Sequence, residues 1–223
     1  PEVRDLAGHY DEVVVATGVR PRTPDIPGID DPRCVSYIDI LTGKAEAGRR
    51  VAIIGAGGIG FDVAEYLSGP SQQEAASVAH FLQEWGVDKD IAMPGALGTP
   101  AEPEIKRQIV MLQRKPGRMG RTLGLSTGWV LRIALAKRKV AQLTGVTYQK
   151  IDAEGLHIRV GDEARVLPVD TIVICAGQES ERTLADGLIA AGTTPHVIGG
   201  ADVAAELDAM RAIDQGVRLA YTF

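Results

Sequence analysis

The glycine-rich segment at residues 55–60 constrains the fold of this chain more than any other feature. An apolar, β-branched run at residues 51–54 leads into it, and residues 61–67 after it have the pattern of a helix. In such a unit the first glycine allows a tight turn, the second lets the backbone approach a pyrophosphate, and the third lets the helix pack closely on the strand. The amides at the helix start then face the negative charge. The pattern predicts a dinucleotide site, rather than a purely structural glycine turn, at Gly55, Ala56, Gly57, Gly58, Ile59 and Gly60.

The order of predicted strands and helices indicates an α/β fold: a Rossmann-like NAD(P)H-binding domain with a central parallel sheet and an antiparallel meander. Apolar runs predict the parallel strands, and helical spacing predicts the helices between them. Short alternating runs, broken at Glu154-Gly155 and Gly161-Asp162, predict the meander beside the sheet. The strands are expected at residues 49–54, 108–112, 140–143 and 171–175, the meander at 146–152, 156–160 and 164–167, and the helices up to about residue 67 and at 129–139.

Two further helices are expected to bury an apolar face. The insertion at residues 68–107 has helical spacing over residues 74–85, and the rest of it has the composition of a surface loop. We expect the insertion helix to be packed through one side, formed by Val78, Phe81, Leu82 and Trp85. We expect the closing helix of the chain to bury a stripe formed by Leu207, Met210, Ile213, Val217 and Ala220.

The composition is that of a globular protein. Of the 223 residues, 45% are hydrophobic, and the formal net charge is −5, so the chain has no general attraction to nucleic acid. No stretch approaches the roughly 20 apolar residues of a membrane span. Cys34 and Cys175 form neither a CxxC pair nor a metal-ligand spacing, so no metal site is expected. Without an export signal, the expected location is the cytoplasm.

The residues after the second predicted strand decide which nicotinamide cofactor is bound. An NAD site places a carboxylate there to accept hydrogen bonds from the ribose 2′-hydroxyl, whereas this chain has Gln113-Arg114-Lys115. Guanidinium and ammonium groups pair with the extra phosphate of NADPH, which a carboxylate would repel. Arg118 and Arg121 add positive charge in the same loop. The sequence therefore favours NADPH at Arg114, Lys115 and Arg118, and the alternative is a solvated basic loop without a ligand.

Both ends of the chain resemble the segments with which two-dinucleotide flavoproteins complete their FAD domain. A strand at residues 13–16 runs into Thr17-Gly18, and a strand at residues 197–198 runs into residues 199–202. The resemblance implies residues 1–30 as a trailing FAD-domain strand and connection. It implies residues 31–192 as the NADPH-binding domain and residues 193–223 as the closing FAD-domain segment. The glycine loop for the FAD pyrophosphate would lie upstream of Pro1.

The same resemblance implies contacts with FAD. Asp202 would hydrogen-bond the ribityl chain, with an ordinary helix cap as the alternative. The start of the closing helix, near Arg211 and Ala212, would face the isoalloxazine. The remaining residues assigned to the cofactors by this resemblance are Thr17, Gly18 and Gly177, the last of which follows the strand that ends the inserted domain.

A closer resemblance covers nearly the whole chain. Residues 53–62, the insertion ending in residues 108–115, residues 126–129 and residues 198–208 together resemble the C-terminal third of bacterial NADPH-dependent 2,4-dienoyl-CoA reductases. The resemblance implies that this chain holds NADPH and shares FAD, while an upstream barrel domain of the same polypeptide carries FMN and a four-iron–four-sulfur (4Fe-4S) cluster. In that family NADPH reduces FAD, electrons cross the cluster to FMN, and FMN reduces the dienoyl thioester in fatty acid β-oxidation.

The sequence leaves several alternatives open. Thr127 and Trp129 begin a predicted helix, where Trp129 would either stack on a cofactor ring or act as a buried anchor. The chain could instead be a non-catalytic ADP-binding domain, a part of an NADH-using enoate reductase, or a part of a thiol-reducing flavoenzyme. The last would need a dithiol, and no CxxC occurs. Because the cofactors themselves perform hydride transfer, no catalytic acid or base is expected in this chain.

Overall fold

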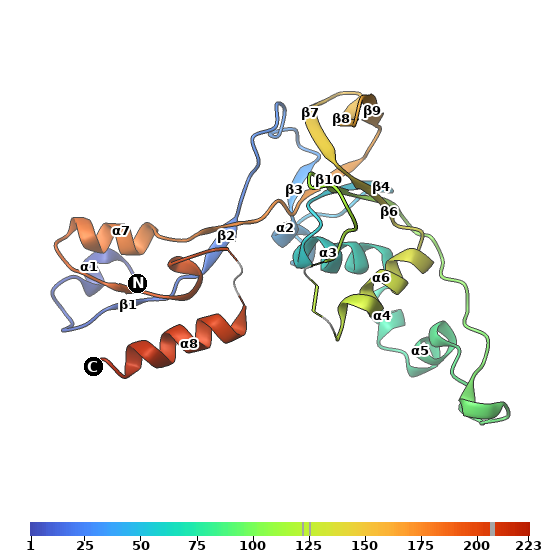
Figure 1. Cartoon of the computed structure of the whole chain (residues 1–223), viewed down its shortest axis with the longest axis horizontal. Coiled ribbons are helices and arrows are strands. Elements are labelled where there is room, and N and C mark those ends of the chain that lie inside the picture. Colours follow the sequence, from blue (N-terminus) through green and yellow to red (C-terminus); the bar gives the residue numbers. More distant parts are fainter. Residues whose placement is uncertain (122, 125, 206–207) are drawn as a thin grey trace. The chain divides into compact units, whose positions relative to one another are not determined.

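The computed structural model describes residues 1–121, 123–124, 126–205 and 208–223, without the side chains of residues 72 and 73, and divides into two compact units. Unit 1 comprises Pro1–Arg22 and Gly177–Phe223, and unit 2 comprises Thr23–Ala176 (Figure 1). The second part of unit 1 begins earlier than residue 193. The reason is that β11 (Gln178–Ser180) pairs with β2 (Val19–Pro21), and α7 (Thr183–Ala190) contacts α1 (Val3–Leu6).

Unit 2 contains a five-stranded parallel sheet, which confirms the α/β fold. The four predicted strands are present, and the strand before the glycine loop lies at the centre of the sheet. The sequence pattern misses the edge strand β3, because its three residues are only partly buried and form no apolar run. The order of the strands is β3 (Cys34–Ser36), β10 (Thr171–Ile174), β4 (Arg50–Ile54), β5 (Gln108–Gln113) and β6 (Ala141–Thr144).

Different layers cover the two faces of this sheet. On β4, Val51 and Ile53 pack in the cluster that contains Phe61, in the helix after the glycine loop. Ala52 and Ile54, on the other face, pack against the meander. Strands that are buried on both faces have continuous apolar sequences, which is why the sequence identifies them. The helical layer is formed by α2 (Tyr37–Leu41), α3 (Gly58–Ser68) and α6 (Gly128–Lys137) (Figure 1). The other layer is a separate antiparallel sheet, as expected, formed by β7 (Val146–Asp152), β8 (Gly155–Val160) and β9 (Glu163–Leu167).

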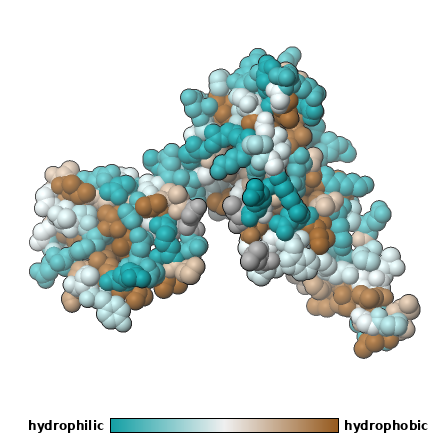
Figure 2. Space-filling model, in the orientation of Figure 1, coloured by the Kyte–Doolittle hydropathy of each residue, from teal (hydrophilic) through white to brown (hydrophobic). Residues whose placement is uncertain are grey.

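The insertion does not form one packed helix, so that prediction is wrong. It forms α4 (Gln72–Ala75) and α5 (Val78–Trp85), and Ser77 begins α5 by accepting a hydrogen bond from the His80 amide at 3.3 Å. Val78 is 73% exposed and Phe81 54% exposed. The rest of the insertion is mostly irregular chain with one 3₁₀ turn, Pro94–Ala96, and does not cover this face. Figure 2 shows the resulting apolar surface in brown at the end of unit 2, lower right.

The core of unit 1 lies around a two-stranded parallel pair, β1 (Val14–Val15) with β12 (His196–Val197). The closing helix is α8 (Ala209–Ala220), and a 3₁₀ turn, Gly199–Ala201, contacts it. The expected burial of its apolar stripe is wrong. The 3₁₀ turn does not cover that side of the helix: the described stripe residues Met210, Ile213, Val217 and Ala220 are all exposed, the first three by at least half. Leu207, also assigned to the stripe, lies outside the described residues.

No helix within the described parts of the chain combines the length and the apolar character that crossing a membrane requires.

An ion pair ties the start of β10 to β4 in unit 2. Asp170 accepts hydrogen bonds from the Arg50 amide at 2.8 Å and from Arg50 Nε at 3.1 Å. These bonds lower the pKa of Asp170 to about 2. A carboxylate whose pKa is lowered by folding stabilises the native state above its unfolded pKa, near 4, and loses this contribution as the pH falls toward 2.

We therefore expect Asp170→Asn to unfold at lower urea than the parent protein at pH 7. The gap between the two urea midpoints should shrink steadily from pH 4 to pH 2. Asp162→Asn, in the exposed β8–β9 turn, is the matched control and should show no such gap. A gap for Asp170→Asn that is equally large at pH 7 and pH 2 would show that the charge of Asp170 does not stabilise the fold.

Candidate dinucleotide site

The turn between β4 and α3 admits only glycine at two positions. Gly55 has φ +117°, and a Cβ on it would lie 2.1 Å from the carbonyl oxygen of Cys175. Its amide donates to the Leu112 carbonyl at 3.0 Å. A Cβ on Gly60 would lie 2.2 Å from the carbonyl oxygen of Gly55. The turn is therefore closed against β5 and the residue after β10 on one side, and its first glycine is closed against the helix α3 on the other.

The middle of the same loop is open. A Cβ on Gly57 or Gly58 would have no heavy atom within 4 Å, and both residues are exposed. Gly57 is the N-cap of the 11-residue helix α3, whose first turn contains no acidic residue. The first amides of a helix have no carbonyl partner within it and carry the positive end of its dipole. The loop thus fits a pyrophosphate, while Ala56 and Ile59 turn toward the core.

The basic segment lies next to this loop. β5 pairs with β4 in parallel, with Leu112 opposite Ile54, so the residues after β5 emerge at the same edge of the sheet as the glycine loop. Gln113 holds the turn by donating from Nε2 to the Lys115 carbonyl at 2.8 Å. Burial raises the pKa of the Tyr148 phenol, and the charge of Arg114 partly offsets this rise. Arg114 therefore lies near Tyr148, whose hydroxyl donates to the Leu112 carbonyl at 3.3 Å.

The loop that carries the other basic residues is fastened to the first turn of α3. Met119 is fully buried in the helical layer, and Gly120 lies so close to Phe61 that a Cβ would be 2.9 Å from its ring. Arg132 of α6 donates to the Gly120 carbonyl at 3.1 Å. These anchoring residues were not predicted from the sequence; the signal for them is the apolar Met119, between Gly117 and Gly120 in an otherwise basic loop.

The basic side chains themselves are exposed on this fixed loop. Arg114, Lys115, Arg118 and Arg121 form no ion pair with any described residue. They place four positive charges in one short loop that follows the strand beside the glycine turn. No carboxylate occurs within residues 113–121, so the loop lacks the group that would accept hydrogen bonds from a ribose 2′-hydroxyl. Their contact with a 2′-phosphate remains a prediction.

Trp129 is not a buried anchor, so that alternative is wrong. It is 53% exposed, in the first turn of α6, and Thr127 before it is also exposed. The buried residue here is Gly128, between Thr127 and Trp129. A Cβ on Gly128 would lie 2.6 Å from the Cβ of Leu123, so there is no space for a side chain. Stacking of Trp129 on a cofactor ring remains a prediction, as does a role for Thr127.

In unit 1 the chain makes sharp turns at two of the positions assigned to FAD, and a third position forms a side-chain hydrogen bond. Gly18 has φ +78° and Gly177 has φ +103°, conformations that favour glycine. Thr17 donates from its hydroxyl to the Glu181 carbonyl at 2.6 Å. These contacts join the segment after β1 to the segment after β11, but they do not by themselves identify a ligand.

A cavity of about 420 Å³ in unit 1 brings further predicted positions together. Gly18 and Ala212 line it, and Asp202 does not. Asp202 accepts a hydrogen bond from Gln215 of α8 at 3.0 Å. It is not the cap of the closing helix, so that alternative is wrong.

The cap of α8 is Asp208, which was not predicted. Its side chain accepts from the Arg211 amide at 2.8 Å. The signal for it is an aspartate immediately before a helical pattern. Arg211 Nε is buried and has no hydrogen-bond partner among the described residues, and Arg211 does not line the cavity.

The thiols of Cys34 and Cys175 are not activated for thiol–disulfide exchange. Burial raises the pKa of Cys175 to about 12, and burial together with the charge of Asp31 raises that of Cys34 to about 11. Both are protonated at neutral pH, whereas thiol–disulfide exchange requires the thiolate. The cysteines of this chain thus do not provide the dithiol of a thiol-reducing enzyme.

Comparison with known proteins places these features in one family. Residues 3–209 match the model of the family described as "Pyridine nucleotide-disulphide oxidoreductase". A metal reductase of Desulforamulus reducens is 30% identical over 183 residues, which are 81% of this chain and 26% of that protein. The chain spans between about a quarter and a third of the length of the curated relatives it matches.

Solved structures share the fold at lower sequence identity. A 2-naphthoyl-CoA reductase in complex with 2-naphthoyl-CoA matches with a TM-score of 0.71 and 20% identity, over 96% of this chain and 27% of that chain. An engineered water-forming NADPH oxidase bound to NADPH matches with a TM-score of 0.56 and 18% identity, over 95% of this chain and 46% of that chain.

Proposed function

Because this chain belongs to the pyridine nucleotide-disulphide oxidoreductase family, which implies FAD and NAD(P)H as cofactors, we propose that unit 2 binds NADPH and presents it for hydride transfer to FAD. The observation that carries the proposal is the open glycine loop beside a fixed loop of unpaired basic residues. Unit 1 would supply part of the FAD site through Thr17, Gly18, Gly177, Asp202, Arg211 and Ala212.

The residues of unit 2 bind and orient the cofactor. The amides of residues 58–60 would hold the pyrophosphate, and the closed turn at Gly55 and Gly60 keeps them in place. Arg114, Lys115 and Arg118 would pair with the 2′-phosphate. When bound, the nicotinamide supplies the hydride and the flavin accepts it, so the protein contributes distance and orientation. The engineered NADPH oxidase supports this reading, because two of its five substitutions introduce arginine and one removes aspartate.

The reaction of the whole protein is a further part of the proposal. We place the chain in a 2,4-dienoyl-CoA reductase, in which an upstream barrel domain with FMN and a 4Fe-4S cluster reduces the thioester in the cytoplasm. The sequence resemblance supports this assignment, and so does the shared fold with a reductase whose described ligand is also a CoA thioester. An NADH-using reductase and a domain that only holds ADP are the competing functions.

Calorimetric titration with NADPH, NADH, 2′,5′-ADP and 5′-ADP at fixed salt tests the proposal. We expect NADPH to bind at least tenfold tighter than NADH, because the two differ only in the 2′-phosphate. We also expect binding of 2′,5′-ADP, which carries the 2′-phosphate without a pyrophosphate. Equal binding of NADH and NADPH would favour the NADH-using reductase. Binding of 5′-ADP without binding of either nicotinamide cofactor would favour the ADP-holding domain.

A further inference from the structure

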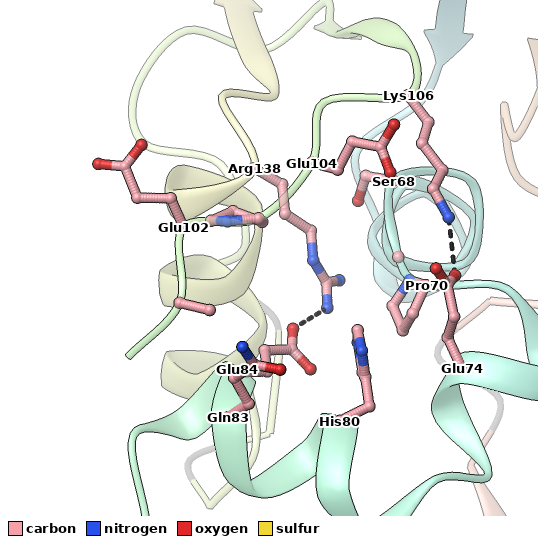
Figure 3. Close-up of a pocket in the computed structure, with 13 residues that line it drawn as sticks. Ser68, Pro70, Glu74, His80, Gln83, Glu84, Glu102, Glu104, Lys106 and Arg138 are labelled. Carbon is pink, nitrogen blue, oxygen red and sulfur yellow. Dashed lines mark hydrogen bonds and ion pairs between the residues drawn. The ribbon is translucent and has the colours of Figure 1, made fainter. Parts of the chain in front are cut away.

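A second cavity lies inside unit 2, at the end of α3 remote from the glycine loop. Its volume is about 180 Å³, and its walls come from the C-terminal end of α3, from α5, from residues 101–106 and from the end of α6 (Figure 3). An engineered apolar cavity of about 150 Å³ holds a benzene molecule, so this one has room for about six to eight non-hydrogen atoms.

The side chain of Arg138 lies in the middle of this cavity (Figure 3). Only 9% of it is exposed. Its Nη2 donates to Glu84 Oε1 at 2.8 Å, whereas its Nη1 is buried and has no hydrogen-bond partner among the described residues. A buried donor without an acceptor is costly, and more so on a charged group. Arg138 Nη1 therefore calls for an oxygen acceptor inside the cavity.

The charges around the cavity decide what kind of molecule can bring that oxygen. Glu84 is paired with Arg138, and Glu74 with Lys106 Nζ at 2.7 Å. Glu102 and Glu104 also line the cavity and form no ion pair within the described chain. The carboxylate of Glu102 points away from Arg138 (Figure 3), but those of Glu74, Glu84 and Glu104 still outnumber the two cations.

The helix end adds to this negative field. Ser68 and Gly69 bring the C-terminal end of α3, the negative end of its dipole, to the same wall. An anion would be repelled, while a cation would be attracted.

We propose that this cavity binds a small organic cation that also carries a neutral carbonyl oxygen. The carbonyl oxygen accepts the hydrogen bond from Arg138 Nη1. The ammonium group lies toward Glu104 and the end of α3. The site is separate from the glycine loop and does not depend on which nicotinamide cofactor is bound there.

β-Alaninamide tests the proposal, since it has six non-hydrogen atoms, one ammonium group and one amide carbonyl. Three molecules of similar size separate the contributions: propionamide lacks the ammonium, propylammonium lacks the carbonyl, and β-alanine replaces the amide with a carboxylate. Binding is followed on the ¹⁵N-labelled chain by amide shifts. We expect β-alaninamide to shift Ser68, Gly69 and His80 and to bind at least tenfold tighter than each of the other three.

Two variants place the ligand in the cavity. Arg138→Lys keeps a cation beside Glu84 but removes Nη1, and should weaken β-alaninamide at least tenfold while leaving propylammonium unchanged. The variant Glu104→Gln should weaken β-alaninamide and propylammonium and leave propionamide unchanged. Glu163→Gln, an exposed carboxylate on β9, is the control and should change nothing.

Three outcomes would overturn the proposal. If no probe shifts these amides, the cavity holds water only. If propylammonium binds as tightly as β-alaninamide, Arg138 does not recognise an oxygen. If β-alanine binds most tightly, the cavity selects a carboxylate instead. Thermal unfolding of Arg138→Lys, measured beside the binding, shows whether a loss of affinity comes from a loss of fold.

Discussion

Replacing Gly55 with alanine is expected to lower the free energy of unfolding of unit 2 by about 3 to 5 kcal/mol. Two costs act together: a φ of +117° that alanine rarely adopts, and a Cβ placed 2.1 Å from a backbone oxygen. Both tryptophans, Trp85 and Trp129, lie in unit 2, so urea unfolding followed by their fluorescence reports on this unit. Loss of NADPH binding should accompany the loss of stability.

Gly57→Ala is the matched comparison, because a Cβ there meets no heavy atom within 4 Å. Its stability should stay within about 0.5 kcal/mol of the parent protein. Its affinity for NADPH should still fall at least tenfold, since the methyl group projects into the space of the pyrophosphate. If Gly57→Ala binds NADPH normally, the glycine loop is a structural turn and the pyrophosphate lies elsewhere.

Arg114→Glu is expected to weaken NADPH binding by about 10- to 100-fold and NADH binding by less than about threefold. A charge-assisted hydrogen bond to the 2′-phosphate contributes about 1.5 to 3 kcal/mol, and the new carboxylate repels that phosphate. The same carboxylate can accept hydrogen bonds from the ribose of NADH, as in NAD-binding sites. The measurement is calorimetric titration of the variant with both cofactors at fixed salt.

The control for Arg114→Glu is Lys89→Glu, which makes the same charge change at an exposed site in the insertion. It should leave both affinities unchanged, because exposed charges that do not contact the ligand are largely screened at physiological salt. Equal weakening of NADPH by the two variants would mean that only the net charge of the chain matters. An unchanged preference for NADPH in Arg114→Glu would assign the 2′-phosphate to other residues.

Much of the central fold of unit 2 could be predicted from the sequence. The strands β4, β5 and β10 are buried on both faces, so their sequences are continuous apolar runs that few other structures produce. The glycine loop was predictable for a similar reason, because the backbone at Gly55 and Gly60 excludes any side chain. The meander was marked by its two turns.

The insertion and the closing helix were not predictable in the same way. Helical periodicity in α5 and α8 correctly indicated amphipathic helices, but periodicity does not say whether anything covers the apolar face. The anchoring of the basic loop was also hidden, since it depends on the contact of Gly120 with Phe61 and on a bond from Arg132, which are distant in sequence. A short edge strand such as β3, with three partly buried residues, has too few residues to show the alternation or apolar run that predicts a strand.

The pairing of β1 with β12 has a consequence for the order of folding. All of unit 2 separates these strands in sequence, so closing that loop in an unfolded chain would cost entropy before any contact in unit 1 formed. Once unit 2 is folded, its two ends are held at a fixed separation. The Arg22 amide can then donate to the Gly177 carbonyl at 3.0 Å. We therefore expect unit 2 to fold first and to bring the two segments of unit 1 close together, so that β1 can pair with β12.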